Sequence, residues 1–476
     1  MTPRSWKPIA LAAGALLAAG ALLLAGLEAR TRGAEQAGTP GEATPGPAEA
    51  TPAPGRPPGQ GPPSAPATGQ EAGFAGTPAR LATVPAGHQL GEARFSADGR
   101  HVAFIATKDG QAAVFLDATR VGTYQDARGL LLREGRSGLA FVASRAGRAL
   151  VVLDGKEGPG FDEIGTVHLA PDGRVVYSAR SSGRWVLVSG AVELAVPGAT
   201  DPSPVVSADG KRVAFVEERA DGGKTSLRAC SLELTGCVTG AAYEGIESQK
   251  SVLAGGRLAF VGGRPGRQAL VTAELDQPGL VERSSGWLEE VLLFALSEGG
   301  AHQAYLARRG GRQVLVRDGQ ALACPELDSP LELLVSSSGR VLVSAVVEDE
   351  VLAYLDGVQL GEAQHGVHFP VFSADGSSLA FAAERDERNL LVVNGQQGPR
   401  FDKVVTPAFT PDGTRVVYRA RDRGERFVVV ADTRARTLRE HPHYEAVYDV
   451  VLSPDSRSVG YGVKIGSELW WKVERL

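Results

Sequence analysis

The chain has 476 residues, 43% of them hydrophobic, and a formal net charge of −5. This mild acidity argues against a nucleic-acid partner, because proteins that bind nucleic acids usually carry a basic excess. Sixty glycines and 29 prolines favour a turn-rich β protein, and the length would suffice for two or three ordinary domains.

An apolar run occupies residues 8–27 and follows two basic residues, Arg4 and Lys7. A basic start before an apolar stretch predicts an export signal, and we assign residues 1–32 to it. Its length of about 20 residues suits a membrane span, so the sequence leaves open an uncleaved anchor and a cleaved signal peptide. Both place the remainder in the periplasm or on the outer face of a bacterial inner membrane, with this segment as the only membrane contact.

Residues 33–80 form a segment rich in Pro, Gly and Ala, with ten prolines between Pro40 and Pro66. Such a composition offers almost nothing to a hydrophobic core, so we expect a disordered or polyproline-like linker. It could act as a stalk that holds the following domain away from a membrane, or as an inert spacer.

From residue 81 to 476 the chain repeats one pattern: an apolar residue, Ser or Thr, Ala or Pro, Asp, usually Gly, and then an apolar strand that contains an aromatic residue. Phe95-Ser-Ala-Asp98-Gly99 leading to Phe104 is the clearest copy. Asp-Gly between apolar stretches predicts a tight β turn. Ten units can be marked by the aromatic or equivalent position, at Phe104, Phe141, Tyr177, Phe215, Phe260, Tyr305, Val343, Phe381, Tyr418 and Tyr461. Steps of roughly 36 to 45 residues between strand-rich units predict a β-propeller.

Each unit continues with a third and a fourth strand, so one unit forms one four-stranded blade. The last unit ends near Val473 and lacks a fourth strand, whereas Leu81–Val84 is a strand candidate without a unit. Pairing the two would close the ring and remove its exposed edges. Ten units favour one ring of seven to ten blades, although two smaller rings also fit the count.

This hairpin pattern, over roughly residues 90–476, resembles the WD40-like (PD40) repeat of TolB-type β-propellers of the bacterial envelope. The resemblance implies the propeller fold and an envelope location. It implies little about activity, because the repeat occurs in periplasmic Tol-Pal components and in propeller domains of prolyl-oligopeptidase-like peptidases. No separate α/β domain precedes the repeats here, which argues against a role in the Tol-Pal system.

Three cysteines and two histidine clusters are the obvious candidates for special chemistry. Cys230 and Cys237 flank a predicted turn, and in an exported protein we expect them to form a disulfide. Cys324 is expected to be a small core residue. The clusters His365-x-x-His368 and His441-Pro-His443 are expected to be solvated loop residues, since no third ligand recurs at a suitable spacing. The recurrent aspartates of the hairpins, Asp98 among them, are interpreted as turn residues and not as calcium ligands.

The sequence also argues against catalysis. There is no G-x-S-x-G elbow and no room for a hydrolase domain. A lactonase-type metal centre would need carboxylate and amide side chains on the innermost strands, and the strand ends Arg94-Phe95 and Val167-His168-Leu169 supply almost none. We therefore predict no cofactor, no metal and no catalytic residue.

Arginines recur in the turns between the second and third strands of the units, which project from one face of a propeller. Such a ring would suit the carboxylates or phosphates of an anionic partner, although charged turns are also explained by solubility alone. The predicted binding residues are Arg145, Arg148, Arg180, Arg184, Arg264, Arg267, Arg308, Arg312, Arg385, Arg388, Arg421 and Arg423.

These observations predict an all-β, non-catalytic, exported and monomeric propeller that acts as a protein-interaction scaffold for unidentified envelope proteins. Two alternatives stay open: binding of an anionic polysaccharide or small ligand at the arginine-rich face, and a metal-dependent hydrolase of lactonase type.

Overall fold

The computed structural model describes residues 76–133, 138–219, 223–247, 251–277, 279–348, 350–362 and 364–476. The predicted export segment and the linker up to residue 75 lie outside these ranges. Every regular element within them is a β-strand. In the described part of the chain no helix is long and apolar enough to cross a membrane.

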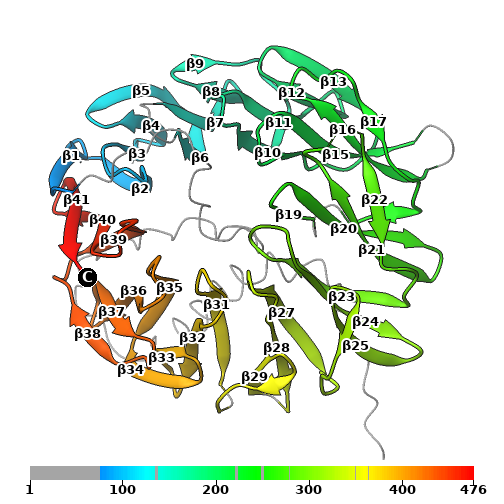
Figure 1. Cartoon of the computed structure of the whole chain (residues 1–476). Coiled ribbons are helices and arrows are strands. Elements are labelled where there is room, and N and C mark those ends of the chain that lie inside the picture. Colours follow the sequence, from blue (N-terminus) through cyan, green and yellow to red (C-terminus); the bar gives the residue numbers. More distant parts are fainter. Residues whose placement is uncertain are drawn as a thin grey trace, which may run out of the picture.

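The strands form ten sheets around one axis, and each sheet is a blade (Figure 1). We number the blades 1 to 10 in chain order. Blade 1 contains β2 (Gln89–Phe95), β3 (Val102–Lys108), β4 (Gln111–Leu116) and β5 (Thr119–Tyr124). Blade 2 contains β6 (Asp126–Leu132), β7 (Leu139–Arg145), β8 (Arg148–Leu153) and β9 (Lys156–Glu157). Blade 3 contains β10 (Glu163–Leu169), β11 (Val175–Ser181), β12 (Arg184–Ser189) and β13 (Val192–Val196). Blade 4 contains β14 (Val205–Val206), β15 (Arg212–Glu218), β16 (Thr225–Ser231) and β17 (Val238–Thr239).

Blade 5 differs from the others because its innermost strand is split into two pieces that both pair with β20. It contains β18 (Gly245–Ile246), β19 (Val252–Ala254), β20 (Arg257–Arg264), β21 (Arg267–Glu274) and β22 (Val281–Ser284). Blade 6 contains β23 (Glu290–Leu296), β24 (Gln303–Arg309), β25 (Arg312–Arg317) and β26 (Gln320–Leu322). Blade 7 contains β27 (Ser329–Val335), β28 (Val341–Val347), β29 (Glu350–Leu355) and β30 (Val358–Gln359).

The remaining strands complete the ring. Blade 8 contains β31 (Gly366–Phe372), β32 (Leu379–Arg385), β33 (Arg388–Val393) and β34 (Gln396–Phe401). Blade 9 contains β35 (Lys403–Phe409), β36 (Arg415–Asp422), β37 (Glu425–Asp432) and β38 (Thr437–Glu440). Blade 10 contains β39 (Ala446–Leu452), β40 (Ser458–Ile465), β41 (Glu468–Arg475) and β1 (Ala79–Thr83).

The two ends of the folded region meet in blade 10. β1 pairs antiparallel with β41, so the first strand in the chain is the outermost strand of the last blade. This confirms the predicted closure, although the strand begins at Ala79, two residues earlier than expected. Ala82 and Val84 are buried with Trp471 and Phe104 in one cluster between blades 10 and 1.

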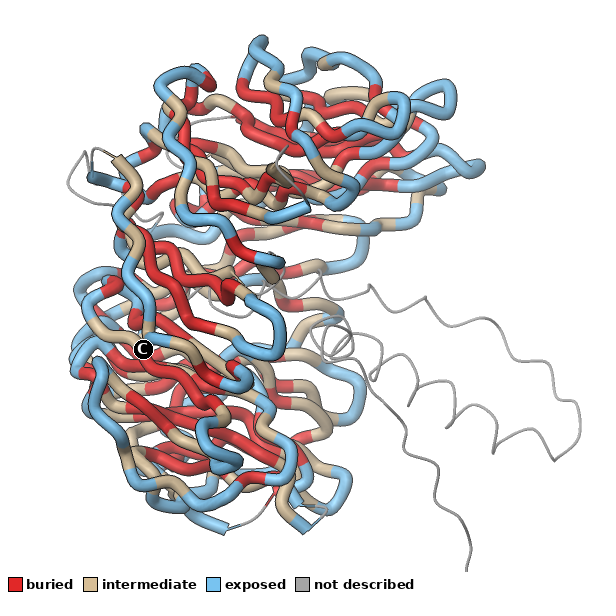
Figure 2. The backbone as a smooth tube through the Cα atoms, turned by 90° about the vertical axis from the view of Figure 1, so that its right-hand side faces the viewer, coloured by how far each residue is buried: buried red, intermediate tan, exposed pale blue. Residues whose placement is uncertain are grey.

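The hydrophobic core of the described chain consists of ten clusters, and each contains residues of two neighbouring blades. The cluster between blades 8 and 9, for example, joins Leu391 to Tyr418 and Val429. Figure 2 shows the buried segments running along the strands, while the turns at both faces are exposed. Ten interfaces between ten blades form one closed ring. The sequence had left open one ring of seven to ten blades or two smaller rings, and the structure has one ring of ten blades.

The Asp-Gly hairpins are held by a hydroxyl–carboxylate pair. Ser96 Oγ donates to Asp98 Oδ1 at 2.5 Å, and Asp98 Oδ1 also accepts the N–H of Arg100 at 3.1 Å. Gly99 follows with a φ of 69°, the left-handed region that glycine adopts without strain. The same hydroxyl–carboxylate contact recurs in Ser207–Asp209, Ser373–Asp375, Thr410–Asp412 and Ser453–Asp455. The turn interpretation of these aspartates is therefore confirmed.

Two faces of the ring follow from this topology. The Asp-Gly face carries the turns between first and second strands and between third and fourth strands. The opposite face, which we call the arginine face, carries the turns between second and third strands and the links from one blade to the next.

Candidate functional site

The twelve predicted arginines lie on the arginine face, in or next to the turns that join second to third strands. Several of them hold neighbouring blades together. Arg148 of blade 2 donates to Asp162 Oδ1 at 2.9 Å, and Asp162 Oδ2 accepts the N–H of Ser182 in blade 3 at 2.6 Å. Arg388 and Asp402 repeat the contact between blades 8 and 9, at 2.8 Å. Further arginine–carboxylate pairs are Arg145–Glu157, Arg180–Glu163, Arg308–Glu290, Arg385–Glu362 and Arg423–Asp422.

The least neutralised arginines gather on blades 5 and 6. Arg267, Arg309 and Arg312 are exposed, and none of them has an ion-pair partner within the residues that the structure describes. Arg264 adds a fourth charge, since its guanidinium lies 4.3 Å from the ring centroid of Trp287. We call these residues, together with Arg308, the arginine patch. Five arginines thus lie in or next to two adjacent turns.

The link from β22 to β23 holds the two halves of the arginine patch next to each other. Leu288 forms a bridge with Gln268 at the start of β21, and Glu289 accepts the N–H of Gly311 at 3.1 Å in the turn of blade 6. Trp287 lies in this link and packs against the cluster between blades 4 and 5. The arginines therefore project from turns with fixed backbones, which suits recognition of several carboxylates at once.

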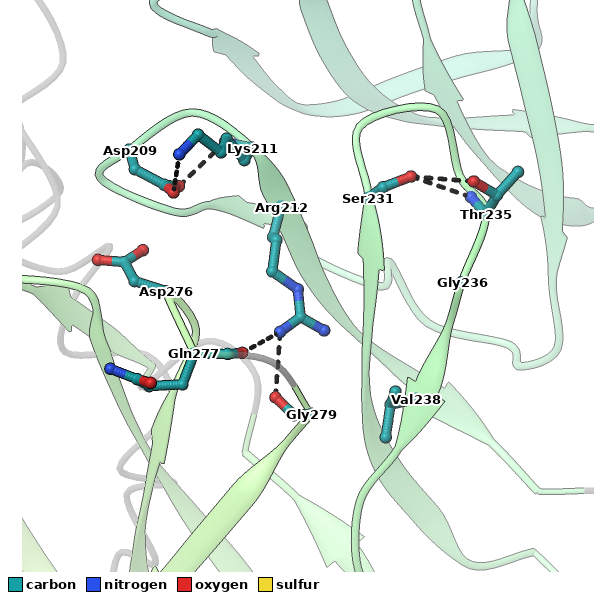
Figure 3. Close-up of a pocket in the computed structure, with 10 residues that line it drawn as sticks. All are labelled: Asp209, Lys211, Arg212, Ser231, Thr235, Gly236, Val238, Asp276, Gln277 and Gly279. Atoms are coloured by element: carbon teal, nitrogen blue, oxygen red, sulfur yellow. Dashed lines mark hydrogen bonds and ion pairs between the residues drawn. The ribbon is translucent and has the colours of Figure 1, made fainter.

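The Asp-Gly face contains a hollow of about 470 Å³ between blades 4 and 5 (Figure 3). Arg212 points across it and donates to the carbonyl oxygens of Gln277 at 2.5 Å and Gly279 at 3.0 Å. Burial raises the pKa of Asp276, and the nearby Asp209 carboxylate raises it further. Sequence reasoning missed this hollow, because its walls come from turns that are far apart in the chain. Arg212 already donates to backbone carbonyl oxygens, so the role of Arg212 in the fold is to hold the turn of blade 5 in place.

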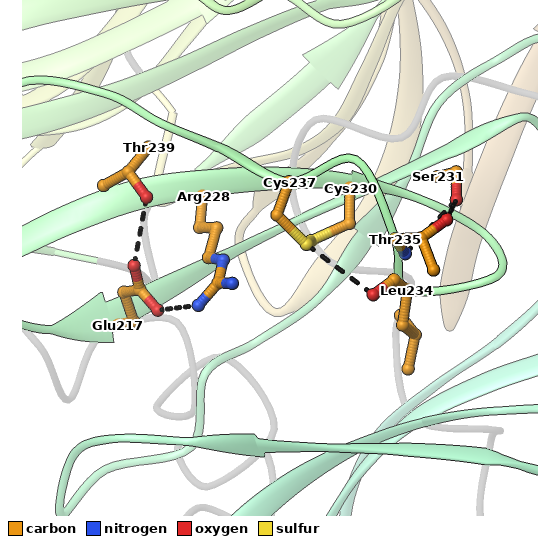
Figure 4. The surroundings of a disulfide bond; sticks show 8 residues. All are labelled: Glu217, Arg228, Cys230, Ser231, Leu234, Thr235, Cys237 and Thr239. Atoms are coloured by element: carbon orange, nitrogen blue, oxygen red, sulfur yellow. Dashed lines mark hydrogen bonds and ion pairs between the residues drawn. A yellow bond between two sulfur atoms is a disulfide. The ribbon is translucent and has the colours of Figure 1, made fainter.

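Cys230 and Cys237 are joined by a disulfide at the end of blade 4 (Figure 4). The bond closes the turn that contains Leu232 and Leu234, and both leucines are buried in the cluster between blades 3 and 4. Ser189 Oγ of blade 3 donates to the carbonyl oxygen of Leu232 at 2.5 Å. The disulfide thus fixes a loop that seals one blade interface.

Reduction of this disulfide is expected to lower the free energy of unfolding by about 2–3 kcal/mol, since it releases a short closed loop. Urea unfolding with and without dithiothreitol measures the effect, and Cys230→Ala/Cys237→Ala should abolish the dependence on reductant. Cys324→Ala is the control, because Cys324 is partly buried between blades 6 and 7 and has no disulfide. An identical midpoint in both conditions for the wild type would contradict the expectation.

The structure corrects the interpretation of two of the clustered histidines, whereas His365 is exposed and lies outside the strands, as expected. His368 lies within β31 and not in a loop, and burial lowers its pKa. His441 is only 4% exposed, so it is not a solvated loop residue. His443 does lie at the surface, where Nδ1 is 2.9 Å from Glu425 Oε2. In the described ranges no three His, Cys, Asp or Glu side chains gather as a metal ion requires.

The innermost strands also carry more carboxylates than the sequence suggested. Glu92, Glu332 and Asp449 belong to β2, β27 and β39. Sequence reasoning considered only the last residues of these strands and therefore missed the acidic side chains near their middle. Arg94, at the end of β2, contacts two of the missed residues. Its Nη1 is 3.4 Å from Asp449 Oδ2 across blades 10 and 1, and its Nε is 3.3 Å from Glu92 Oε1 on its own strand.

Comparisons with known proteins found structural likenesses of low similarity. No family model matches the chain, and no curated protein matches its sequence. Among solved structures, TolB from Acinetobacter baumannii is 12% identical with a TM-score of 0.28, and covers 58% of this chain and 77% of its own. The Dos1 propeller is 9% identical with a TM-score of 0.38, and covers 84% and 94%. An oligogalacturonate lyase from Vibrio parahaemolyticus is 9% identical with a TM-score of 0.31, and covers 66% and 97%. The finer assignment to the PD40 repeat stays a prediction.

Proposed function

We propose that this chain is a non-catalytic, exported β-propeller that serves as a protein-interaction scaffold in the cell envelope. It captures an acidic surface of its partner at the arginine patch. The observation that carries the proposal is the presence of three exposed arginines without ion-pair partners, Arg267, Arg309 and Arg312, on two adjacent turns of the described ring.

The closed ring supports a scaffold role, because its turns keep fixed positions without a second domain. The disulfide supports export, since such bonds persist in oxidising compartments such as the periplasm. The apolar run at residues 8–27 supports it as well.

Charge reversal of the patch is expected to weaken partner binding at least tenfold. In Arg267→Glu/Arg309→Glu/Arg312→Glu, three attractive contacts become repulsive, which mainly slows association and removes its salt dependence. A partner recovered by crosslinking from envelope extract would be purified, and its binding measured at two salt concentrations.

The matched control is Arg100→Glu/Arg434→Glu/Arg457→Glu. It changes the net charge by the same amount on the Asp-Gly face, where all three side chains are exposed. Equal loss of binding in both triple variants, or no loss in either, would contradict the proposal. If the first variant instead loses only binding to polygalacturonate while protein capture persists, the site belongs to the polysaccharide alternative.

A further inference from the structure

Arg212 occupies a position that recurs in the hairpins of the Asp-Gly face. Its backbone N–H donates to the hairpin hydroxyl, Ser207 Oγ, at 3.0 Å. The residues whose backbone N–H makes the same contact in blades 1, 6 and 7 are His101, His302 and Arg340. These four blades therefore present a basic side chain at one equivalent point.

In blades 1, 6 and 7 an aspartate pairs with this basic side chain. The contacts are His101–Asp117 at 2.8 Å, His302–Asp318 at 2.7 Å and Arg340–Asp356 at 3.1 Å. Each aspartate lies opposite the residue that follows the basic one, as when Asp356 Oδ1 accepts the N–H of Val341. In blade 4 the residue in this place is Cys230, which pairs with Val213 and is bound in the disulfide. Blade 4 thus lacks the carboxylate that the other blades supply.

Arg212 has no carboxylate partner within the described ranges. Its Nη1 donates to the carbonyl oxygens of Leu275 at 3.4 Å, Gln277 at 2.5 Å and Gly279 at 3.0 Å. These contacts hold the guanidinium in one orientation. The N–H groups on Nε and Nη2 remain, and they have no partner in the part of the chain that the structure describes. A planar donor edge of this kind matches the two oxygens of a carboxylate.

The free side of the guanidinium faces the hollow between blades 4 and 5. Figure 3 shows this side turned away from the turn of blade 5 and towards the loop that the disulfide closes. The volume of about 470 Å³ lies in the range of about 300–1,000 Å³ that small-molecule sites occupy. Ser231 and Thr235 line the hollow with hydroxyls, and Val238 adds an apolar wall. A carboxylate on Arg212 would therefore lie in a cavity that has room for the rest of a small ligand.

The acidic side chains of the hollow decide what else the ligand carries. Asp209 is paired with Lys211, with Oδ2 and Nζ 3.4 Å apart. Asp276 also lines the hollow, and its exposed carboxylate has no hydrogen-bond or ion-pair partner among the described residues. An ionised carboxylate only accepts hydrogen bonds, so Asp276 suits a hydroxyl or an ammonium group. The two positive and two negative side chains of the lining balance, which disfavours a ligand with several negative charges.

We propose that this hollow binds a small carboxylic acid that also carries hydroxyl or ammonium donors. The carboxylate binds Arg212 and takes the place that an aspartate has beside the basic side chain of blades 1, 6 and 7. The donors bind Asp276. Sugar acids and amino acids share this chemistry. The site goes beyond the scaffold function, because it lies on the Asp-Gly face and uses no residue of the arginine patch.

Isothermal titration of the full chain tests the site with four probes. We expect sodium D-gluconate, L-alanine or both to bind with a dissociation constant of about 1 mM or tighter. D-glucose lacks the carboxylate and sodium acetate lacks the donors, so each should bind more weakly by about tenfold or more. Binding of gluconate alone identifies sugar acids as the ligands, and binding of alanine alone identifies amino acids. If neither binds, or if glucose or acetate binds as tightly as the better ligand, the proposal is wrong.

Two variants remove the free edge of Arg212 in different ways. Arg212→Gln is expected to weaken binding by about tenfold or more, but it also removes contacts that hold the turn of blade 5. Ser231→Asp leaves those contacts in place. Ser231 lies opposite Arg212 in the pairing of β15 with β16, so an aspartate there supplies an internal carboxylate that competes with the ligand. Retained binding in either variant overturns the proposal.

Two controls exclude general effects. Arg340→Gln changes the equivalent position of blade 7, where Asp356 already occupies the guanidinium, and should leave binding unchanged. The triple variant of the arginine patch should also leave binding unchanged, because the patch lies on the opposite face. Equal loss of binding in either control and in Ser231→Asp would contradict a site at Arg212.

Discussion

Deletion of residues 79–84 from the full chain is expected to lower the free energy of unfolding by about 3–5 kcal/mol, as large truncations in a core do. The deletion removes β1 and with it the buried Ala82 and Val84 from the cluster between blades 10 and 1. It also leaves β41 as an open edge, with Trp471, which is 0% exposed in the intact ring, no longer covered. Differential scanning calorimetry would measure the loss, and size-exclusion chromatography would detect association through the free edge.

The control for this deletion removes six linker residues, 50–55, which carry no predicted core position. It should leave the melting temperature unchanged. A synthetic peptide of residues 76–88, added in excess, should recover part of the stability of the deleted chain, because it can occupy the vacant edge of β41. Unaltered melting of the chain without β1 would mean that closure contributes nothing to stability.

The repeat made the fold predictable, because each hairpin contains its own turn chemistry. Asp98 and Gly99 encode the turn locally, and so the strand order and the ring closure could be predicted from spacing, whereas the blade number stayed open between seven and ten. Blade 5 was harder to predict, because its hairpin lacks this local turn chemistry. Its unit has Gly255-Gly256 in place of Asp-Gly, and its innermost strand is split. A Cβ on Gly255 would lie 1.9 Å from the carbonyl oxygen of Gly299, so contact with blade 6 and not local propensity fixes that turn.

The roles of the arginines depend on residues that are distant in the sequence, and this is why their pairing was missed. Arg148 is held by Asp162, and Arg388 is held by Asp402. A signal for these contacts does exist: an aromatic residue followed by an acid precedes several innermost strands, as in Phe161-Asp162 and Phe401-Asp402. The loop geometry of single blades determines which arginines stay unpaired. The sequence pattern does not contain this geometry.

The burial of His441 was equally hidden from the sequence, and it has a consequence for acid stability. His441 lies in the link between β38 and β39, where its N–H donates to the carbonyl oxygen of Val428 at 2.9 Å. Its Nε2 has no hydrogen-bond partner among the described residues. Burial lowers the pKa of His441 to about 4, and the Arg439 charge adds to the effect.

Stability is therefore expected to fall as the pH drops from about 6.5 to about 4. In this range the unfolded chain binds a proton at His441 that the folded chain does not, so the free energy of unfolding rises with pH. The difference of about 2.5 pKa units corresponds to about 3 kcal/mol, present above pH 6.5 and lost below pH 4. Burial lowers the pKa of His168 and His368 as well, which gives the same sign, whereas the raised pKa of Glu332 acts in the opposite direction.

Urea unfolding at pH 7.5, 6.5, 5.5 and 4.5, followed by tryptophan fluorescence, isolates the contribution of His441. His441→Asn is expected to be less stable at pH 7.5 but to show a shallower decline towards pH 4.5, because the contributions of the other groups cancel when the two proteins are compared. His88→Asn is the matched control, since His88 lies in the loop before β2, where its Nδ1 is 3.3 Å from the carbonyl oxygen of Ala86. Parallel declines for wild type and His441→Asn would show that His441 is protonated in the folded ring, and that its burial does not make the protein sensitive to acid.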